Sequence, residues 1–228
     1  MHTDLTIPTR LTYFIATTTA SIVISLSGCN SQKDTTNLKP PPSLETADVT
    51  VKSVNASNDS KPNSDLRVSE PVIPLQTFLD AALNGEKETI QQAVDSRFDL
   101  NSCNEQKRSA VMLAAFNGHT DIVKLLVRNG ASLNLRDTSG RTALMFASTG
   151  TNQDTAEFLI VSGAELNAVD NNEGFTALMF AAAEGQTEVV RTLLKYKANT
   201  LIRDADGESA LGFATKNGHV ETAKLLTE

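Results

Sequence analysis

The feature that most constrains this fold is a six-residue pattern that occurs four times at nearly constant spacing. Its copies occupy residues 109–114 (SAVMLA), 142–147 (TALMFA), 176–181 (TALMFA) and 209–214 (SALGFA). The copies therefore start 33, 34 and 33 residues apart. A period of about 20 to 50 residues is typical of stacked repeats, in which each unit buries its apolar side against its neighbours.

Three further sets of residues share this period: a turn motif, a single asparagine and a Gly-Ala pair. They are Asn117-Gly118-His119 and Asn217-Gly218-His219; Asn101, Asn134 and Asn167; and Gly130-Ala131 and Gly163-Ala164. The residues from 75 onward also carry regular helical periodicity. These landmarks indicate five units over residues 75–228, of which the first diverges most from the others.

Over residues 75–228 the repeated pattern resembles that of the ankyrin family, D-x-x-G-x-T-P-L-H-x-A-A-x-x-G-H-x-x-x-V-x-x-L-L-x-x-G-A-x-x-N. The resemblance implies an all-α repeat solenoid in which each unit is a helix-turn-helix followed by a β-hairpin finger. The expected units cover about 75–103, 104–136, 137–169, 170–203 and 204–228. We expect the first and last to act as caps of the stack.

Individual residue types in the pattern have physical roles. Hydroxyl residues are expected to cap the first helix of a unit, and they are Ser109, Thr142, Thr176 and Ser209. Gly130 and Gly163 are expected to take a left-handed conformation after the second helix, and Asp137–Gly140 and Asp204–Gly207 are typical of tight turns.

The sequence departs from the family pattern in three places. The motif's His is Met145 in unit three and Met179 in unit four, so we expect methionine packing in place of the hydrogen bonds that the family's His makes between repeats. Lys107 replaces the turn glycine of unit two. Unit four gains one residue within Asp170–Gly174, which lengthens its finger.

The N-terminal segment is typical of an export signal. An apolar stretch over residues 11–28 follows Arg10, and it is marginal in length as a permanent membrane span. Leu26-Ser27-Gly28-Cys29 resembles the lipobox of bacterial lipoproteins, which implies cleavage before Cys29 and lipidation of that residue. We expect residues 1–28 to be the signal peptide; an ordinary signal peptide or an uncleaved anchor is the alternative.

Residues 29–74 are expected to be a lipidated cysteine followed by a disordered tether. The segment is rich in Pro, Ser, Thr, Asn, Asp and Lys and has too few apolar groups to offset the entropy of ordering. Its coil-like reach would be on the order of 35 to 40 Å, and several acyl chains would anchor it stably. Asn30 favours the outer membrane over the inner one. With Cys29 lipidated, we expect no internal disulfide at Cys103.

Composition and motifs point away from catalysis and nucleic-acid binding. From Leu75 onward there are 20 Asp and Glu against 14 Lys and Arg, so the basic footprint that nucleic-acid binding needs is missing. His119 and His219 occupy the Gly-His position of the scaffold, and no phosphate-binding loop, C-x-x-C or G-x-S-x-G motif occurs. We expect no enzyme activity, no metal, no cofactor and no small-molecule substrate.

By motif position, the family's concave partner surface maps to finger tips and to the exposed ends of the first helices. The expected partner-binding residues are Arg108, Phe116, Thr138, Ser139, Arg141, Asn172, Glu173, Phe175, Glu184, Asp206 and Glu208. Phe116 and Phe175 stand at positions that the core is not expected to need, and aromatics supply many interface anchors. Alternatively, Phe175 folds back onto the lengthened finger.

The fifth motif position reads Arg108, Arg141, Phe175 and Glu208, so the surface is expected to run from basic to acidic. The sequence therefore favours a monomeric protein-binding module, lipid-anchored on the periplasmic side of a bacterial envelope. It would hold an exported or membrane protein as adaptor, chaperone or inhibitor. A non-specific structural spacer and an ankyrin module behind an uncleaved membrane anchor remain open as alternatives.

Overall fold

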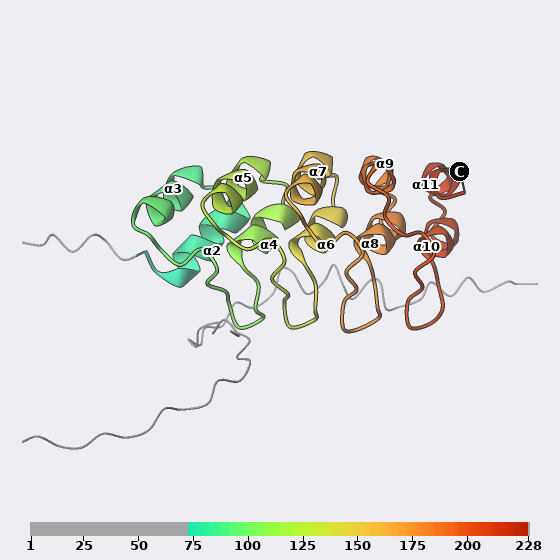
Figure 1. The fold of residues 1–228 in the computed structure, drawn as a ribbon, viewed down its shortest axis with the longest axis horizontal. Coiled ribbons are helices and arrows are strands. Elements are labelled where there is room, and N and C mark those ends of the chain that lie inside the picture. Colours follow the sequence, from blue (N-terminus) through green and yellow to red (C-terminus); the bar gives the residue numbers. More distant parts are fainter. Residues whose placement is uncertain (1–72, 228) are drawn as a thin grey trace, which may run out of the picture.

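Five helix pairs stacked side by side make up the part of the chain that the computed structural model describes, residues 73–227. The first helices of the units lie in one row and the second helices in another (Figure 1). The pairs are α2 Leu75–Asn84 with α3 Lys87–Asp95, α4 Ala110–Phe116 with α5 Thr120–Arg128, α6 Ala143–Ser148 with α7 Gln153–Val161, α8 Ala177–Ala183 with α9 Thr187–Lys195, and α10 Ala210–Lys216 with α11 Val220–Leu225.

Hydroxyl side chains start the first helices of units two to five, as expected. The four hydroxyls accept the backbone N–H three residues on, at 3.2 to 3.5 Å, and belong to Ser109, Thr142, Thr176 and Ser209. In units three and four the bond is reciprocated, because Met145 Sδ and Met179 Sδ each accept the N–H of the capping threonine at 3.5 Å. Methionine at the motif's histidine position therefore packs in the core and also caps its own helix.

The core runs along the whole stack between the two rows of helices. Leu126, Leu159 and Leu193 of the second helices are fully buried, and they belong to the same core cluster as fully buried alanines such as Ala114 and Ala181. Small residues on the first helices let neighbouring backbones approach closely, while the leucines fill the space shared by adjacent units. Each unit is thus stabilised by its neighbours.

Polar side chains at the inter-helix turns join each unit to the one before. His119 Nε2 lies 3.0 Å from the carbonyl oxygen of Leu83, and His219 Nε2 lies 3.0 Å from that of Ala183. Unit three has no histidine there, and Asn152 Nδ2 instead donates to the carbonyl of Phe116 at 2.9 Å. These bonds satisfy carbonyls at the ends of first helices, which the helix itself leaves without a partner.

A second row of bonds links the loops that follow the second helices. The carboxamide oxygens of three asparagines each accept a backbone N–H from the next unit, at 2.8 to 3.0 Å: Asn101 from Ser132, Asn134 from Glu165, and Asn167 from Asn199. The 33-residue spacing of these asparagines therefore reflects one structural role. Gly130 and Gly163 precede this row with φ of 94° and 98°, so their expected left-handed conformation is confirmed.

The fingers are hairpin-shaped loops rather than the expected β-hairpins. Within residues 73–227 the only bridges outside helices are the isolated antiparallel pairs Cys103 with Ser109 and Arg203 with Ser209. The reason lies in the turn aspartates: Asp137 Oδ1, for example, accepts the backbone N–H groups of Ser139 and Arg141 at 2.9 and 2.8 Å. Side-chain bonds of this kind take donors that a strand ladder would use.

Backbone hydrogen bonds also connect the fingers to one another. Each bond joins an N–H of one finger to a carbonyl of the preceding finger, at 2.8 to 2.9 Å: Thr138 to Gln106, Asn171 to Ser139, and Ala205 to Glu173. The four fingers are therefore held in a fixed row on the side of the first helices (Figure 1).

The expected signal peptide, the lipidation site Cys29 and the tether lie outside the described residues. None of the helices between residues 73 and 227 has the length and apolar character that crossing a membrane requires. Cys103 is buried and disulfide-bonded. This contradicts the expectation of no internal disulfide at Cys103, which assumed that Cys29 is lipidated.

Candidate protein-binding surface

The expected partner-binding residues lie on the fingers and the adjoining ends of the first helices, a surface that we call the finger face. Their exposure differs widely. Thr138, Asn172 and Asp206 are exposed; Arg108, Phe116, Ser139, Glu173, Phe175, Glu184 and Glu208 are half-buried; and Arg141 is buried. The structure thus places most of this set where a partner can reach it, with clear exceptions at Arg141 and the two phenylalanines.

Arg141 is used inside the protein, so its expected role as an exposed contact is wrong. Its Nε and Nη2 donate to Asp137 Oδ2 at 3.0 and 2.8 Å, and its guanidinium carbon lies 4.8 Å from the centre of the Phe146 ring. Asp137 is itself almost completely buried, with 1% of its side chain exposed. Arg141 therefore neutralises a buried carboxylate and packs on an aromatic ring.

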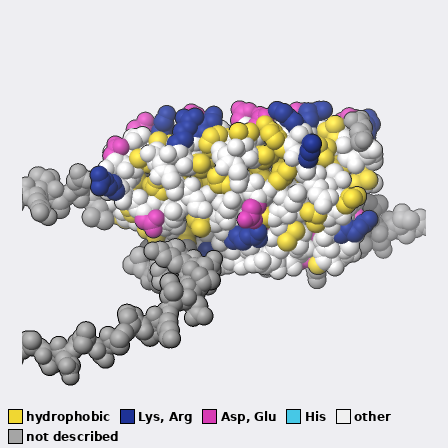
Figure 2. Space-filling view, in the orientation of Figure 1, with side chains coloured by type: hydrophobic (Ala, Val, Ile, Leu, Met, Phe, Trp, Pro, Cys, Tyr) yellow, Lys and Arg dark blue, Asp and Glu magenta, His cyan; other side chains and the backbone are white. Residues whose placement is uncertain are grey.

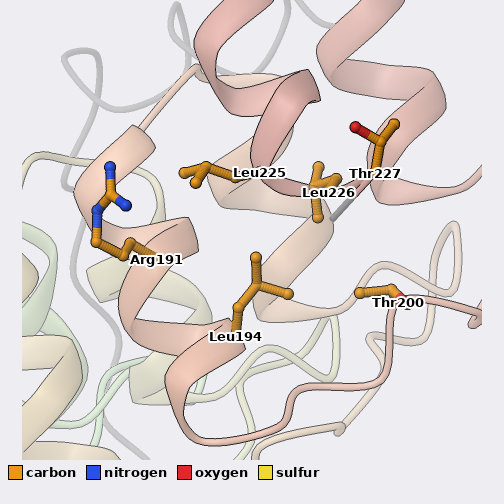
Figure 3. Close-up of a pocket in the computed structure, with 6 residues that line it drawn as sticks. All are labelled: Arg191, Leu194, Thr200, Leu225, Leu226 and Thr227. Atoms are coloured by element: carbon orange, nitrogen blue, oxygen red, sulfur yellow. The ribbon is translucent and has the colours of Figure 1, made fainter.

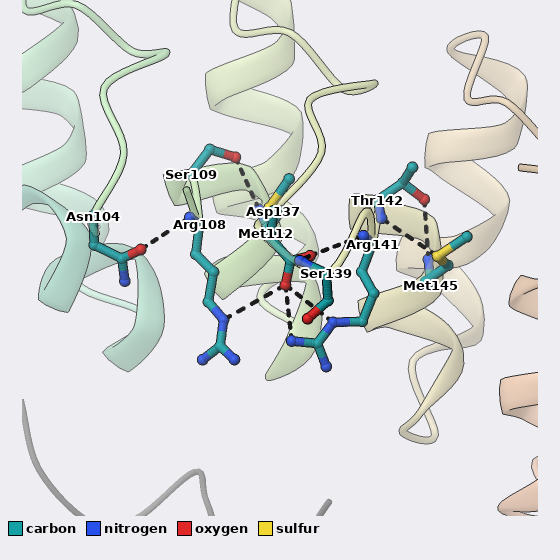
Figure 4. A network of polar contacts seen from close by, with 9 residues as sticks. All are labelled: Asn104, Arg108, Ser109, Met112, Asp137, Ser139, Arg141, Thr142 and Met145. Carbon is teal, nitrogen blue, oxygen red and sulfur yellow. Dashed lines mark hydrogen bonds and ion pairs between the residues drawn. The ribbon is translucent and has the colours of Figure 1, made fainter. Parts of the chain in front are cut away.

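Arg108 stands at the same motif position one unit earlier, yet its surroundings differ (Figure 4). Its Nε lies 3.9 Å from Asp137 Oδ2, is buried and has no hydrogen-bond partner. The guanidinium carbon lies 5.7 Å from the centre of the Phe146 ring, and 27% of the side chain is exposed. Burial and the nearby Arg141 lower the pKa of the Arg108 guanidinium, and Asp137 opposes them.

The two phenylalanines also pack against the core. Phe116 meets Phe146 edge-on at 6.2 Å between ring centres. Phe175 lies between Phe180 of its own unit, at 5.3 Å, and Phe213 of the next unit, at 4.9 Å. The expectation that the core does not need these two residues is wrong, because both rings pack against the core and against other aromatic rings, between or within units.

The far end of the finger face is acidic. Asp206 is exposed on the last finger, and Asp204 Oδ1 holds that finger by accepting the N–H groups of Asp206 and Glu208 at 3.1 and 2.6 Å. Glu184 follows α8, where burial raises the pKa of its carboxyl and the charge of His219 opposes that effect. The finger face therefore carries Arg108 near one end and the carboxylates of Asp206 and Glu208 near the other.

Charged side chains of both signs gather along the opposite edge, over the second helices (Figure 2). Several form exposed ion pairs, such as Lys195 with Glu157 at 2.7 Å and Lys224 with Glu221 at 2.8 Å. Exposed pairs of this kind contribute little to stability or recognition. We therefore assign no binding role to this edge and regard its charged side chains as solvated.

A pocket of about 370 Å³ lies between α9 and α11 (Figure 3). Its lining residues are Arg191, Leu194, Thr200, Leu225, Leu226 and Thr227. None of them is a histidine, cysteine or carboxylate, so the pocket offers no acid–base pair. Across residues 73–227, moreover, no three His, Cys, Asp or Glu side chains come together in a way that would hold a metal ion.

Sequence reasoning missed Asp137 and Phe146 as organisers of the finger face. The sequence predicts only a turn at Asp137 and gives no specific role to Phe146. The available signal was the four-residue spacing between Asp137 and Arg141, which brings an acid and a base together across a tight turn.

Comparison with known protein families agrees with this architecture. A family model for ankyrin repeats, in three copies, matches residues 78–170 and 152–228. No curated protein matches the chain. The family match spans well over half of the chain and includes all five helix pairs, so the chain belongs to the ankyrin-repeat family, a non-enzymatic fold for binding other proteins.

Proposed function

We propose that this chain is a lipid-tethered binding module that faces the periplasm of a bacterial envelope. It holds an exported or membrane protein on the finger face and acts as an adaptor, chaperone or inhibitor. The observation that carries the proposal is the polarity of that face, from Arg108 at one end to Asp206 at the other. A single chain suffices for this role, and no cofactor takes part in it.

The rigidity of the fingers supports binding of a specific partner. Their tips are joined by backbone bonds such as Thr138 N–H to Gln106 O at 2.9 Å, and their turns are held by aspartate side chains. A surface that is already ordered loses little conformational entropy when a partner docks. Side chains at the tips, such as Thr138, Asn172 and Asp206, can then determine which protein is bound.

Residues N-terminal to the repeats support the tether. The lipobox-like Leu26-Ser27-Gly28-Cys29 would supply the lipid, and the Pro-rich, polar segment that follows would hold the repeats away from the bilayer. Asn30 favours the outer membrane for the anchor.

Photocrosslinking in the producing cells tests the binding role. A photoreactive amino acid such as benzoylphenylalanine replaces Thr138 or Asp206 on the finger face, and Val161, 66% exposed on α7, serves as the matched control. We expect the same protein to be crosslinked from both finger positions and not from residue 161. Crosslinks that are equally unspecific at all three positions would favour a structural spacer.

Metabolic labelling with palmitate tests the anchor. We expect label on the full chain that is lost with Cys29→Ala and kept with Cys103→Ala, together with a processed N-terminus by mass spectrometry. Cys103 is disulfide-bonded in the structure, and a sulfur held in a thioether cannot form a disulfide. The lipidated form that we propose is therefore one in which Cys29 does not pair with Cys103. An unlabelled chain whose mobility on gels changes with reductant would contradict the lipid anchor.

A further inference from the structure

Two arginines share one carboxylate beneath the fingers of units two and three. Arg108, Asp137 and Arg141 (Figure 4) form this group together with Phe146, whose ring lies near both guanidinium groups. We call it the Arg108 cluster. Its formal charge is plus one, because one carboxylate faces two guanidinium groups. Arg108 lies within ion-pair distance of Asp137, but no hydrogen bond joins the two side chains.

The carboxylate of Asp137 has no acceptor capacity left for Arg108. A carboxylate offers about four lone-pair sites. Oδ1 accepts from the N–H groups of Ser139 and Arg141 at 2.9 and 2.8 Å, and Oδ2 accepts from Arg141 Nε and Nη2 at 3.0 and 2.8 Å. This saturation explains why Arg108 Nε stays 3.9 Å away.

We propose that Arg108 is the docking point for a carboxylate of the partner polypeptide, an Asp or Glu side chain that pairs with its guanidinium. The inference rests on the proposed function, because it places the partner on the finger face. The terminal nitrogens of Arg108 point away from Asp137 (Figure 4), and the planar guanidinium suits a bidentate pair with a carboxylate.

The surroundings of Arg108 strengthen such a pair. The side chain is only 27% exposed, its Nε is shielded from water, and the guanidinium rests against Phe146. An ion pair in a partly desolvated place is stronger than one on open surface. The half-buried ring of Phe116, which meets Phe146 edge-on, offers an apolar contact beside the carboxylate.

The acidic end of the finger face then fixes the direction of the partner. A segment with an acidic residue at Arg108 and basic residues toward Asp206 meets complementary charge along its length, whereas the reversed segment meets like charge at both ends. Asp137 and Arg141 act as positioning residues in this arrangement, since they hold the Phe146 ring and the finger around Arg108.

A phage-displayed library of 12-residue peptides, selected on the purified full chain, tests the proposal. We expect selected peptides to share an Asp or Glu at one fixed position. Arg108→Gln should weaken their binding about 10- to 100-fold, and Arg108→Lys nearly as much, because the bidentate geometry is lost. Arg128→Gln, a change at an exposed arginine on α5, should leave affinity unchanged.

A nuclear magnetic resonance measurement gives a direct structural reading of the same event. In protein labelled with ¹⁵N-arginine, the signal of the Arg108 Nη–H groups, which would donate to the partner carboxylate, should move downfield when a selected peptide is added. The same peptide with its fixed acid changed to the amide should leave that signal in place.

Different failures separate the two proposals. Peptides that bind the finger face without a fixed acid, and that ignore Arg108→Gln, would overturn the carboxylate site but leave the binding module standing. Peptides whose binding ignores both Arg108→Gln and a bulky change at Thr138 would count against the finger face itself. If inorganic phosphate binds in an Arg108-dependent way and acidic peptides do not, the assignment to a polypeptide carboxylate is wrong.

Discussion

Phe175 and Phe213 meet at 4.9 Å between ring centres, across the boundary between the fourth and fifth repeats. Phe175 thus contributes to the contact between units as well as to the finger face. Among the described residues, the fifth unit packs against one neighbouring unit, through contacts of α10 and α11 with α8 and α9. A ring that reaches across this last boundary therefore matters more to stability than its half-exposed position suggests.

We predict that Phe175→Ala lowers the free energy of unfolding by about 2 kcal/mol. Urea denaturation of the full chain measures the loss. Phe213→Ala should cost a similar amount, and the double variant should cost about 1 kcal/mol less than the sum of the two. Strict additivity would show that the two rings do not stabilise one another.

Arg141→Gln should also be destabilising, by about 2 kcal/mol, because it leaves the buried Asp137 carboxylate without its strongest partner. Arg191, which forms an exposed pair with Glu188 at 3.4 Å, is the control, and Arg191→Gln should change stability by no more than about 0.5 kcal/mol. Equal effects at the two arginines in thermal or urea unfolding would contradict the structural role of Arg141.

Lys107 and Lys197 both stand where the repeat pattern has glycine, and both keep a positive φ, of 57° and 66°. A side chain in this left-handed conformation costs about 1 kcal/mol. Lys107→Gly and Lys197→Gly should each therefore raise the melting temperature.

Gly207 allows the same backbone effect to be tested in the opposite direction, by replacing a glycine of positive φ with alanine. It has φ of 81° and open space where a Cβ would be, so Gly207→Ala tests backbone strain alone and should lower the melting temperature. Stabilisation by alanine at 207, or no gain from glycine at 107 and 197, would show that these conformations carry no strain.

Glu184 should make stability depend on pH. Because burial raises the pKa of this carboxyl in the folded state, the folded protein binds its proton more readily than the unfolded chain does. Stability is then lost as pH rises through the unfolded pKa toward the folded one. Glu184→Gln should be more stable than the natural protein at pH 7, and the difference should vanish near pH 3. A difference that is constant with pH in denaturation curves would contradict this reasoning.

The stack itself was predictable because its determinants are local and repeated. The helix caps at Thr142 and Thr176 depend only on a hydroxyl side chain and the first turn of the same helix. The left-handed conformation at Gly130 likewise depends on the end of the helix that precedes it. Such features depend on a few adjacent residues, so the spacing of the motif places them correctly.

The finger face was harder to predict because its side chains depend on neighbours that the motif does not fix. Arg108 and Arg141 share a motif position, but the residue four positions earlier is Asn104 in one unit and Asp137 in the other. The neutral carboxamide of Asn104 accepts the backbone N–H of Arg108, at 2.9 Å, whereas the carboxylate of Asp137 draws the Arg141 side chain inward. The change from amide to acid therefore accounts for the burial of Arg141 and the greater exposure of Arg108.

The longer finger of unit four shows how the stack accommodates a change in length. Asp170 Oδ1 accepts three successive backbone N–H groups, from Glu173, Gly174 and Phe175, at 2.9 to 3.1 Å, so the added residue is absorbed within the loop. The next helix still begins with its hydroxyl cap at Thr176. Loop tips of this kind can gain residues during evolution without disturbing the helices. They are therefore positions where the protein could acquire a new partner. For the same reason, they are positions where a foreign epitope could be grafted.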